Sequence, residues 1–250
     1  MINIFQNADA SLVKKSASQC LEKILIENSG KKILLLLSGG SALSLLSFNT
    51  KCLGNHLTIG VLDERYSTDP KINNFQQLSA TPFFTEAEKR GCKFMVTKVK
   101  DNESIQDLAL RFEKELRLWK KNNPKGLVII TQGMGPDGHT SGIMPYPENK
   151  NLFDKQFENN DKWVVGYDAV NKNQYPLRVT ITIPFLKLVD ISIIYISGKE
   201  KAGVLNKILS EKIPQNIFPI TIIKEMKKTF LFTDITISQD HAIKKNKVEK

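Results

Sequence analysis

The apolar residues of the chain fall into short continuous runs, and segments of helical periodicity lie between them. Runs that we interpret as strands occur at residues 31–37, 57–62, 94–97, 127–131, 163–167, 178–183, 191–196, 220–223 and 229–233. Runs of this length, ended by glycine, proline or charged residues, are typical of parallel strands buried on both faces. The run at 178–183 differs because it alternates with period two, which predicts a strand with one buried face.

Helices are predicted between these strands. They are expected at residues 9–28, 42–48, 104–121, 185–189 and 202–209. Asp9 and Ser11 are both suitable caps for the first helix, and Gly30 is a suitable end. Strands that alternate with helices indicate an α/β fold, with a mainly parallel open sheet and helices on both faces in a Rossmann-like arrangement.

Length and composition predict one globular domain over residues 1–240, followed by a basic tail at 241–250. The chain has 250 residues, 41% of them hydrophobic, and contains no linker-like segment or internal repeat. No apolar run reaches the roughly 18 residues of a membrane span, and the first residues lack a signal-peptide pattern, so we expect no membrane partner. Three cysteines without a close pair favour a reducing cytoplasm over a disulfide framework or zinc site.

The formal net charge of +10 favours anionic ligands such as phosphorylated small molecules or nucleic acid. The lysines are scattered rather than striped, and no zinc-finger or RNA-recognition pattern is present, so we expect no nucleic-acid partner. A solvated, lysine-rich surface is the alternative explanation for most of this charge.

The most informative stretch is the loop at 132–145, which follows the apolar run 127–131. It contains closely spaced glycines, namely Gly133, Gly135, Gly138 and Gly142. Asp137 and His139 lie among them, and His139 is one of only three histidines in the chain. Ligands of open α/β sheets bind at the carboxyl ends of strands, where a histidine can act as a general base. The alternatives are a simple turn and a surface histidine.

Three further segments at predicted strand ends suit an anion. Ser38, Gly39, Gly40 and Ser41 form a strand–turn–helix junction whose N–H groups could hold a phosphate. Asp63 and Arg65 follow another strand, where the aspartate suits a base or its orienting group and the arginine suits a phosphate. Lys201 begins a helix after a third strand. The alternatives are an ordinary turn, a solvated strand end and a solvated helix end.

Taken together, these motifs resemble the sugar-phosphate isomerase/lactonase family, which includes glucosamine-6-phosphate isomerases and 6-phosphogluconolactonases. The resemblance covers nearly the whole chain and rests on Leu37-Ser-Gly-Gly-Ser41, Asp63-Glu-Arg65, Asn73-Asn74, Gly133-Met-Gly-Pro-Asp-Gly-His-Thr140, Arg178-Val-Thr-Ile-Thr182 and Gly198-Lys-Glu-Lys201. The isomerases carry a glutamate five residues after the histidine, where this chain has Met144. The segment from Thr140 to Pro145 instead looks like the lactonase pattern Thr-Ala-Ser-Leu-Phe-Pro. Ala42-Leu43 departs from the Thr-Pro that is usual in lactonases.

The resemblance implies an enzyme that hydrolyses 6-phosphogluconolactone in the cytoplasm, without a metal or other cofactor, as a monomer or weak homodimer. It implies that His139 activates water and that either Asp137 or Asp63 orients the histidine or the water. The residues implied to bind the sugar phosphate are Ser38, Gly39, Gly40, Ser41, Arg65, Asn74, Arg178 and Lys201. An amino-sugar phosphate isomerase and a catalytically weak sugar-phosphate-binding relative are the alternatives.

Overall fold

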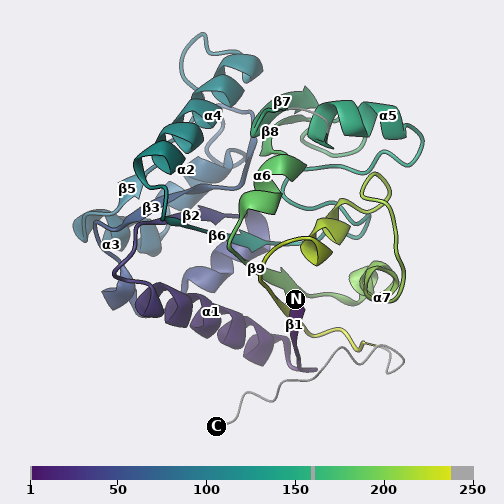
Figure 1. Ribbon diagram of the computed structural model, residues 1–250, viewed down its shortest axis with the longest axis horizontal. Helices are drawn as coiled ribbons and strands as arrows, with labels where there is room; N and C mark the ends of the chain where they lie inside the picture. The colour runs from purple at the N-terminus through teal and green to yellow at the C-terminus, as the bar shows by residue number, and fades with distance from the viewer. Residues whose placement is uncertain (1, 159–160, 238–250) are drawn as a thin grey trace.

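The computed structural model describes residues 2–158 and 161–237, and its centre is a seven-stranded sheet (Figure 1). All neighbouring strands are parallel, in the order β1-β10-β9-β6-β2-β3-β5. The strands are β1 (Ile2–Gln6), β2 (Ile33–Leu37), β3 (Leu57–Val61), β5 (Lys93–Phe94), β6 (Leu127–Gln132), β9 (Ile191–Ile196) and β10 (Thr229–Thr233).

Helices cover both faces of this sheet, as predicted. The α-helices are α1 (Ala10–Glu27), α2 (Asn74–Ser79), α3 (Pro82–Lys89), α4 (Ile105–Asn122), α5 (Lys150–Phe153), α6 (Ile183–Leu188) and α7 (Ala202–Ser210). Side chains of β2 alternate between two cores because successive residues of a strand point to opposite faces. Leu34 packs in the core that contains Phe112 of α4, whereas Leu35 packs in the core that contains Leu21 of α1.

A second, antiparallel sheet lies beside the first and has the order β4-β8-β7. Its strands are β4 (Asp63–Arg65), β8 (Leu177–Ile181) and β7 (Val164–Asp168). The prediction of one buried face at 178–183 was wrong, because polar residues such as Arg178 and Thr180 are buried as well as the apolar ones. The polar face of β8 is buried because it lies against Asp63 and the loop that follows His139.

Several element boundaries also differ from the sequence expectation. The run 220–223 is not a strand but part of a 3₁₀ helix, Pro219–Lys224 (η5), because short apolar runs do not distinguish buried strands from buried helices. The predicted helix at 42–48 is the 3₁₀ helix Gly40–Leu46 (η1). Asp9 caps α1 as expected, but the helix ends at Glu27, and Asn28 rather than Gly30 is its C-cap. Strand β1 and helices α2 and α3 were not predicted.

The sheet changes its direction of winding between β2 and β6. Strands β3 and β5 continue outward on the β2 side, and β9 and β10 continue on the β6 side. The loops that leave β2 and β6 therefore diverge from neighbouring strand ends, where ligands of open α/β sheets bind. The backbone N–H of Ser38 donates to Thr131 Oγ1 at 3.0 Å, which ties these two strand ends together.

The predicted tail at 241–250 lies outside the described residues, as do the last three residues of the predicted domain. Within the described part of the chain, no helix combines the length and the apolar composition that a bilayer crossing requires.

Candidate active site

The loop after β6 folds tightly around His139. The Gly135 N–H donates to the His139 carbonyl at 3.0 Å, and the Gly138 N–H donates to the Gly135 carbonyl at 3.0 Å. A side chain at Gly135 would place its Cβ 2.2 Å from the imidazole, so only glycine fits there. Gly138 has φ of +80°, and a Cβ there would lie 2.6 Å from the Phe218 ring. The glycines of this loop therefore permit the imidazole to be enclosed by backbone.

Asp137 is the carboxylate that contacts this imidazole. Its Oδ1 lies 2.6 Å from His139 Nδ1 and also accepts a hydrogen bond from the His139 backbone N–H at 3.2 Å. Partial burial alone would raise the pKa of Asp137, but the hydrogen bonds from His139 outweigh it and hold that pKa below the ordinary value. The carboxylate is therefore ionised near neutral pH, which favours a proton on Nδ1 and leaves the Nε2 lone pair able to accept one.

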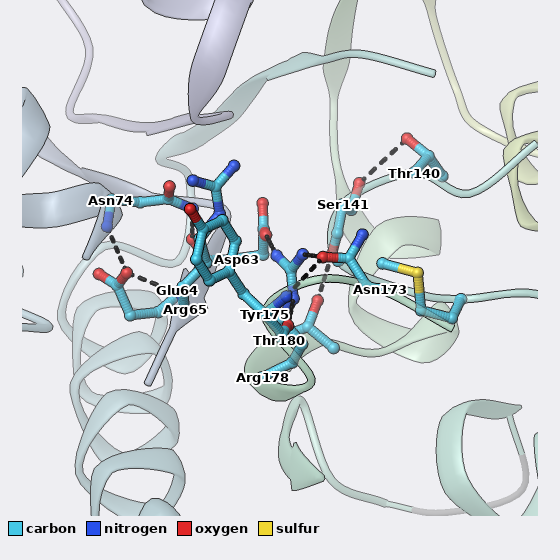
Figure 2. A network of polar contacts seen from close by, with 12 residues as sticks. Asp63, Glu64, Arg65, Asn74, Thr140, Ser141, Asn173, Tyr175, Arg178 and Thr180 are labelled. Atoms are coloured by element: carbon cyan, nitrogen blue, oxygen red, sulfur yellow. Dashed lines mark hydrogen bonds and ion pairs between the residues drawn. The ribbon is translucent and has the colours of Figure 1, made fainter. Parts of the chain in front are cut away.

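Asp63 is bound to an arginine instead of to the histidine. Its Oδ2 lies 3.3 Å from Nη1 of Arg178, and both side chains are buried (Figure 2). Arg178 also donates to the Tyr175 carbonyl and to Asn173 Oδ1, each at 2.9 Å. The two aspartates that the sequence offered as alternatives thus have different partners. Asp137 contacts the imidazole, and Asp63 forms an ion pair with a buried guanidinium.

Arg65 brings a second guanidinium to the same side of the small sheet. It is paired in register with Arg178 on β8, and its guanidinium lies over the Tyr175 ring, 5.0 Å from the centroid (Figure 2). Its Nε is buried without a hydrogen-bond partner, and no carboxylate of the described residues forms an ion pair with it. Arg65 therefore offers a positive charge that is not neutralised by a neighbour, as an anion site requires.

The Ser38–Ser41 turn meets this cluster through Asn74. The amide Nδ2 of Asn74 donates to the Asp63 carbonyl at 2.9 Å, while its Oδ1 is buried and accepts no hydrogen bond from the residues that the structure describes. A Cβ on Gly39 would lie 2.4 Å from that oxygen, so the turn and the amide are in close contact. Gly40 has φ of +63°, which begins the 3₁₀ helix. The side chain of Ser41 lies outside what the structure describes.

Lys201 ends a short 3₁₀ turn, Lys199–Lys201 (η4), after β9. Asp234 holds the start of this turn by accepting from the Gly198 N–H at 3.2 Å and from Ser197 Oγ at 2.6 Å. No hydrogen bond or ion pair among the described residues joins the Lys201 amine to the other predicted site residues. The structure thus places Lys201 at the same edge of the sheet, one strand beyond β6, without a contact to them.

A buried polar network fixes the end of the histidine loop, and sequence reasoning did not find it. Gln132 Nε2 donates to Ser141 Oγ at 2.9 Å, and Ser192 Oγ donates to Gln132 Oε1 at 2.6 Å. Thr180 donates its hydroxyl to the Ser141 carbonyl (Figure 2). Ser141 has φ of +53°, an uncommon conformation for a residue other than glycine. The contacts of Ser192 and Thr180 come from distant segments, so no local sequence signal pointed to them.

Asn173 and Tyr175 were also missed, because the loop between β7 and β8 carries no motif. No group of three metal-ligating His, Cys, Asp or Glu side chains occurs among the residues that the structure describes.

The fold and the site define an α/β protein with a histidine–aspartate pair and an arginine cluster at a topological switch point, which is the position of a small-ligand site. The family model for glucosamine-6-phosphate isomerases/6-phosphogluconolactonase matches residues 7–232. The chain therefore belongs to this family.

Curated relatives match over most of their own length. The 6-phosphogluconolactonase of Bos taurus is 24% identical over 230 residues, which cover 86% of this chain and 81% of that protein. The 6-phosphogluconolactonase of Thermotoga maritima is 27% identical over 215 residues, which cover 84% of this chain and 89% of that protein.

Solved structures share the fold. The crystal structure of 6-phosphogluconolactonase from Thermotoga maritima matches with a TM-score of 0.67 and 22% identity, covering 93% of this chain and 99% of that chain. The 6-phosphogluconolactonase from Trypanosoma brucei matches with a TM-score of 0.72 and 15% identity, covering 93% of this chain and 96% of that chain.

Proposed function

We propose that the protein hydrolyses 6-phospho-D-glucono-1,5-lactone to 6-phospho-D-gluconate. The observation that carries this proposal is the contact between Asp137 and His139 inside the glycine loop, because it supplies an oriented base beside an anion-binding cluster. Curated relatives of similar length bear the name of this activity. The proposal places the enzyme in the cytoplasm, in keeping with its free cysteines.

In this mechanism the Nε2 atom of His139 accepts a proton from a water molecule as the water oxygen attacks the lactone carbonyl carbon. A tetrahedral intermediate forms, and its oxyanion is stabilised by backbone N–H groups of a glycine turn. The bond from that carbon to the ring oxygen then breaks, and the imidazolium returns the proton to the ring oxygen. Asp137 stabilises the imidazolium throughout because its carboxylate remains bound to Nδ1.

Arg65 is the principal phosphate-binding residue in this proposal, because its charge has no carboxylate partner among the described residues. Arg178 supports it, although Asp63 already neutralises much of its charge. N–H groups of the Ser38–Ser41 turn and the Lys201 amine complete the phosphate contacts. Holding the phosphate orients the lactone carbonyl toward the water beside His139, so remote binding assists the chemistry.

Met144 gives no support to the alternative that the protein is an amino-sugar isomerase. This side chain is fully buried in the apolar core, where the isomerases have a glutamate that takes part in their proton transfers. An apolar group in that position supplies no proton.

The proposal is tested by the rate at which freshly made 6-phosphogluconolactone disappears with and without the protein. We expect clear acceleration over spontaneous hydrolysis and no release of ammonia from glucosamine 6-phosphate. Binding of 6-phosphogluconate without acceleration of lactone hydrolysis would contradict the proposed enzymatic activity. It would indicate a sugar-phosphate-binding relative instead. Ammonia release would favour the isomerase.

A further inference from the structure

Glu64 lies between two residues of the site, but its side chain points the other way. Strand β4 places Asp63 and Arg65 on one face and Glu64 on the opposite face, toward α2. The side chain of Glu64 is completely buried. Glu64 takes no part in the proposed mechanism, so its burial requires a separate explanation.

The carboxyl group of Glu64 accepts four hydrogen bonds from three segments of the chain. Oε1 accepts from the backbone N–H groups of Arg65 at 2.8 Å and Asn74 at 2.5 Å. Oε2 accepts from the Phe75 N–H at 3.0 Å and the Thr97 hydroxyl at 2.8 Å. Burial, opposed by these hydrogen bonds, raises the pKa of Glu64 to about 8. Burying a carboxyl group at this cost is uncommon unless its contacts are needed.

The contact with Asn74 leads directly into the site. Glu64 fixes the backbone of this first residue of α2, and Asn74 in turn donates to the Asp63 carbonyl (Figure 2). The Asn74 side chain also packs against Gly39. One buried carboxyl group therefore holds together the arginine strand, helix α2 and, through Asn74, the glycine turn. These are the parts of the site to which the proposed function assigns the phosphate.

We propose that Glu64 is a positioning residue for sugar-phosphate binding, which sets the spacing between Arg65 and the Ser38–Ser41 turn by fixing Asn74. This inference rests on the proposed function. Glu64 touches no substrate in it and takes no part in proton transfer. Its removal is expected to weaken binding rather than to slow the chemical step.

Two variants remove the hydrogen bonds of Glu64 to different extents. Glu64→Met keeps a similar length and removes every acceptor, whereas Glu64→Gln keeps one oxygen for the Arg65 and Asn74 N–H groups and leaves the Phe75 N–H without its acceptor. We expect KM for 6-phosphogluconolactone to rise about tenfold or more in Glu64→Met and less in Glu64→Gln, with kcat within about threefold of wild type in both. If Glu64→Met does not fold, the Gln variant alone carries the test.

Asn73→Ala is the matched control. Asn73 caps the same helix by accepting from the Gln76 N–H at 2.9 Å, and it donates to the Thr97 carbonyl at 3.4 Å. Its loss therefore destabilises α2 and the Thr97 segment, but it removes none of the four donors to the Glu64 carboxyl group. We expect a lower melting temperature and an unchanged KM. An equal rise of KM in this control would assign the effect to fraying of α2 and overturn the inference, as would an unchanged KM in both Glu64 variants.

Binding of 6-phosphogluconate, measured by calorimetry, separates this inference from the proposed function. If the wild type does not hydrolyse the lactone, the function fails, and the affinities of the variants for 6-phosphogluconate still test Glu64. If the wild type is active and the Glu64 variants bind like wild type, the function stands and the positioning role fails.

Discussion

The two halves of the site are built in contrasting ways. On the histidine side, Asp137 and His139 are two positions apart and form their contact within one loop. On the arginine side, Asp63 and Arg178 are 115 positions apart and meet only because β4 and β8 pair. The first half depends on local glycine geometry, and the second depends on the completed fold.

Because of this difference, the two halves of the site contribute unequally to the stability of the fold. The Asp137 carboxylate is 39% exposed, so the protein loses little if its contact is removed. The Asp63–Arg178 pair is buried, and removing one partner leaves an uncompensated charge in the interior. We therefore expect substitutions in the first half to change kcat and substitutions in the second to change folding or substrate binding.

The largest effect is expected for Asp137→Asn. An amide at this position no longer stabilises the imidazolium, so kcat for lactone hydrolysis should fall by about 10²–10⁴ while the melting temperature changes little. Steady-state kinetics with thermal unfolding of the same sample measures both. A loss of stability with a normal kcat would remove the contrast between the two halves.

Arg178→Met tests the buried pair. The variant leaves Asp63 unpaired in the interior, and the free energy of unfolding should fall by about 3–5 kcal/mol. Urea unfolding measures this loss, and the double variant Asp63→Asn/Arg178→Met should recover part of it. A decrease in the free energy of unfolding of less than about 1 kcal/mol would be typical of an exposed ion pair and would contradict a structural role for Asp63 and Arg178.

Arg65→Ala tests whether the second half also binds the phosphate. KM should rise about tenfold or more with kcat nearly unchanged, because the phosphate is held equally in the ground and transition states. Arg65→Lys is the control, since it retains the charge but loses the planar contact with Tyr175. A similar KM in all three proteins would remove Arg65 from the phosphate site.

The last prediction concerns a gradual change of stability with pH. Because the pKa of Glu64 is raised from 4.5 to about 8, the folded protein retains a proton over this range that the unfolded chain has released. Glu64 thus makes the free energy of unfolding fall as pH rises from about 5 to 8, because over this range the folded protein binds a proton that the unfolded chain does not. Glu64→Gln should lack this slope, which urea unfolding of both proteins at several pH values would detect. Parallel pH profiles would show that Glu64 is ionised throughout.

The features that could be predicted from the sequence are those formed by residues close together along the chain. Hydrophobic runs identified most strands of the parallel sheet, and the glycine spacing identified the His139 loop. The pairing of Asp63 with Arg178 was not predicted, because periodicity gives no information about which distant strands meet. The contacts of Glu64 were missed for the same reason, although alternation along a strand would have placed it opposite Asp63 and Arg65.

The proposed mechanism depends on one step, in which the imidazole of His139 accepts the proton of the attacking water. The most direct test compares hydrolysis of fresh 6-phosphogluconolactone by the wild type and His139→Ala, with 6-phosphogluconate binding measured on both proteins. We predict that the variant loses about 10² or more of the acceleration and binds 6-phosphogluconate with nearly unchanged affinity. Turnover close to that of the wild type in the variant would contradict this role for His139.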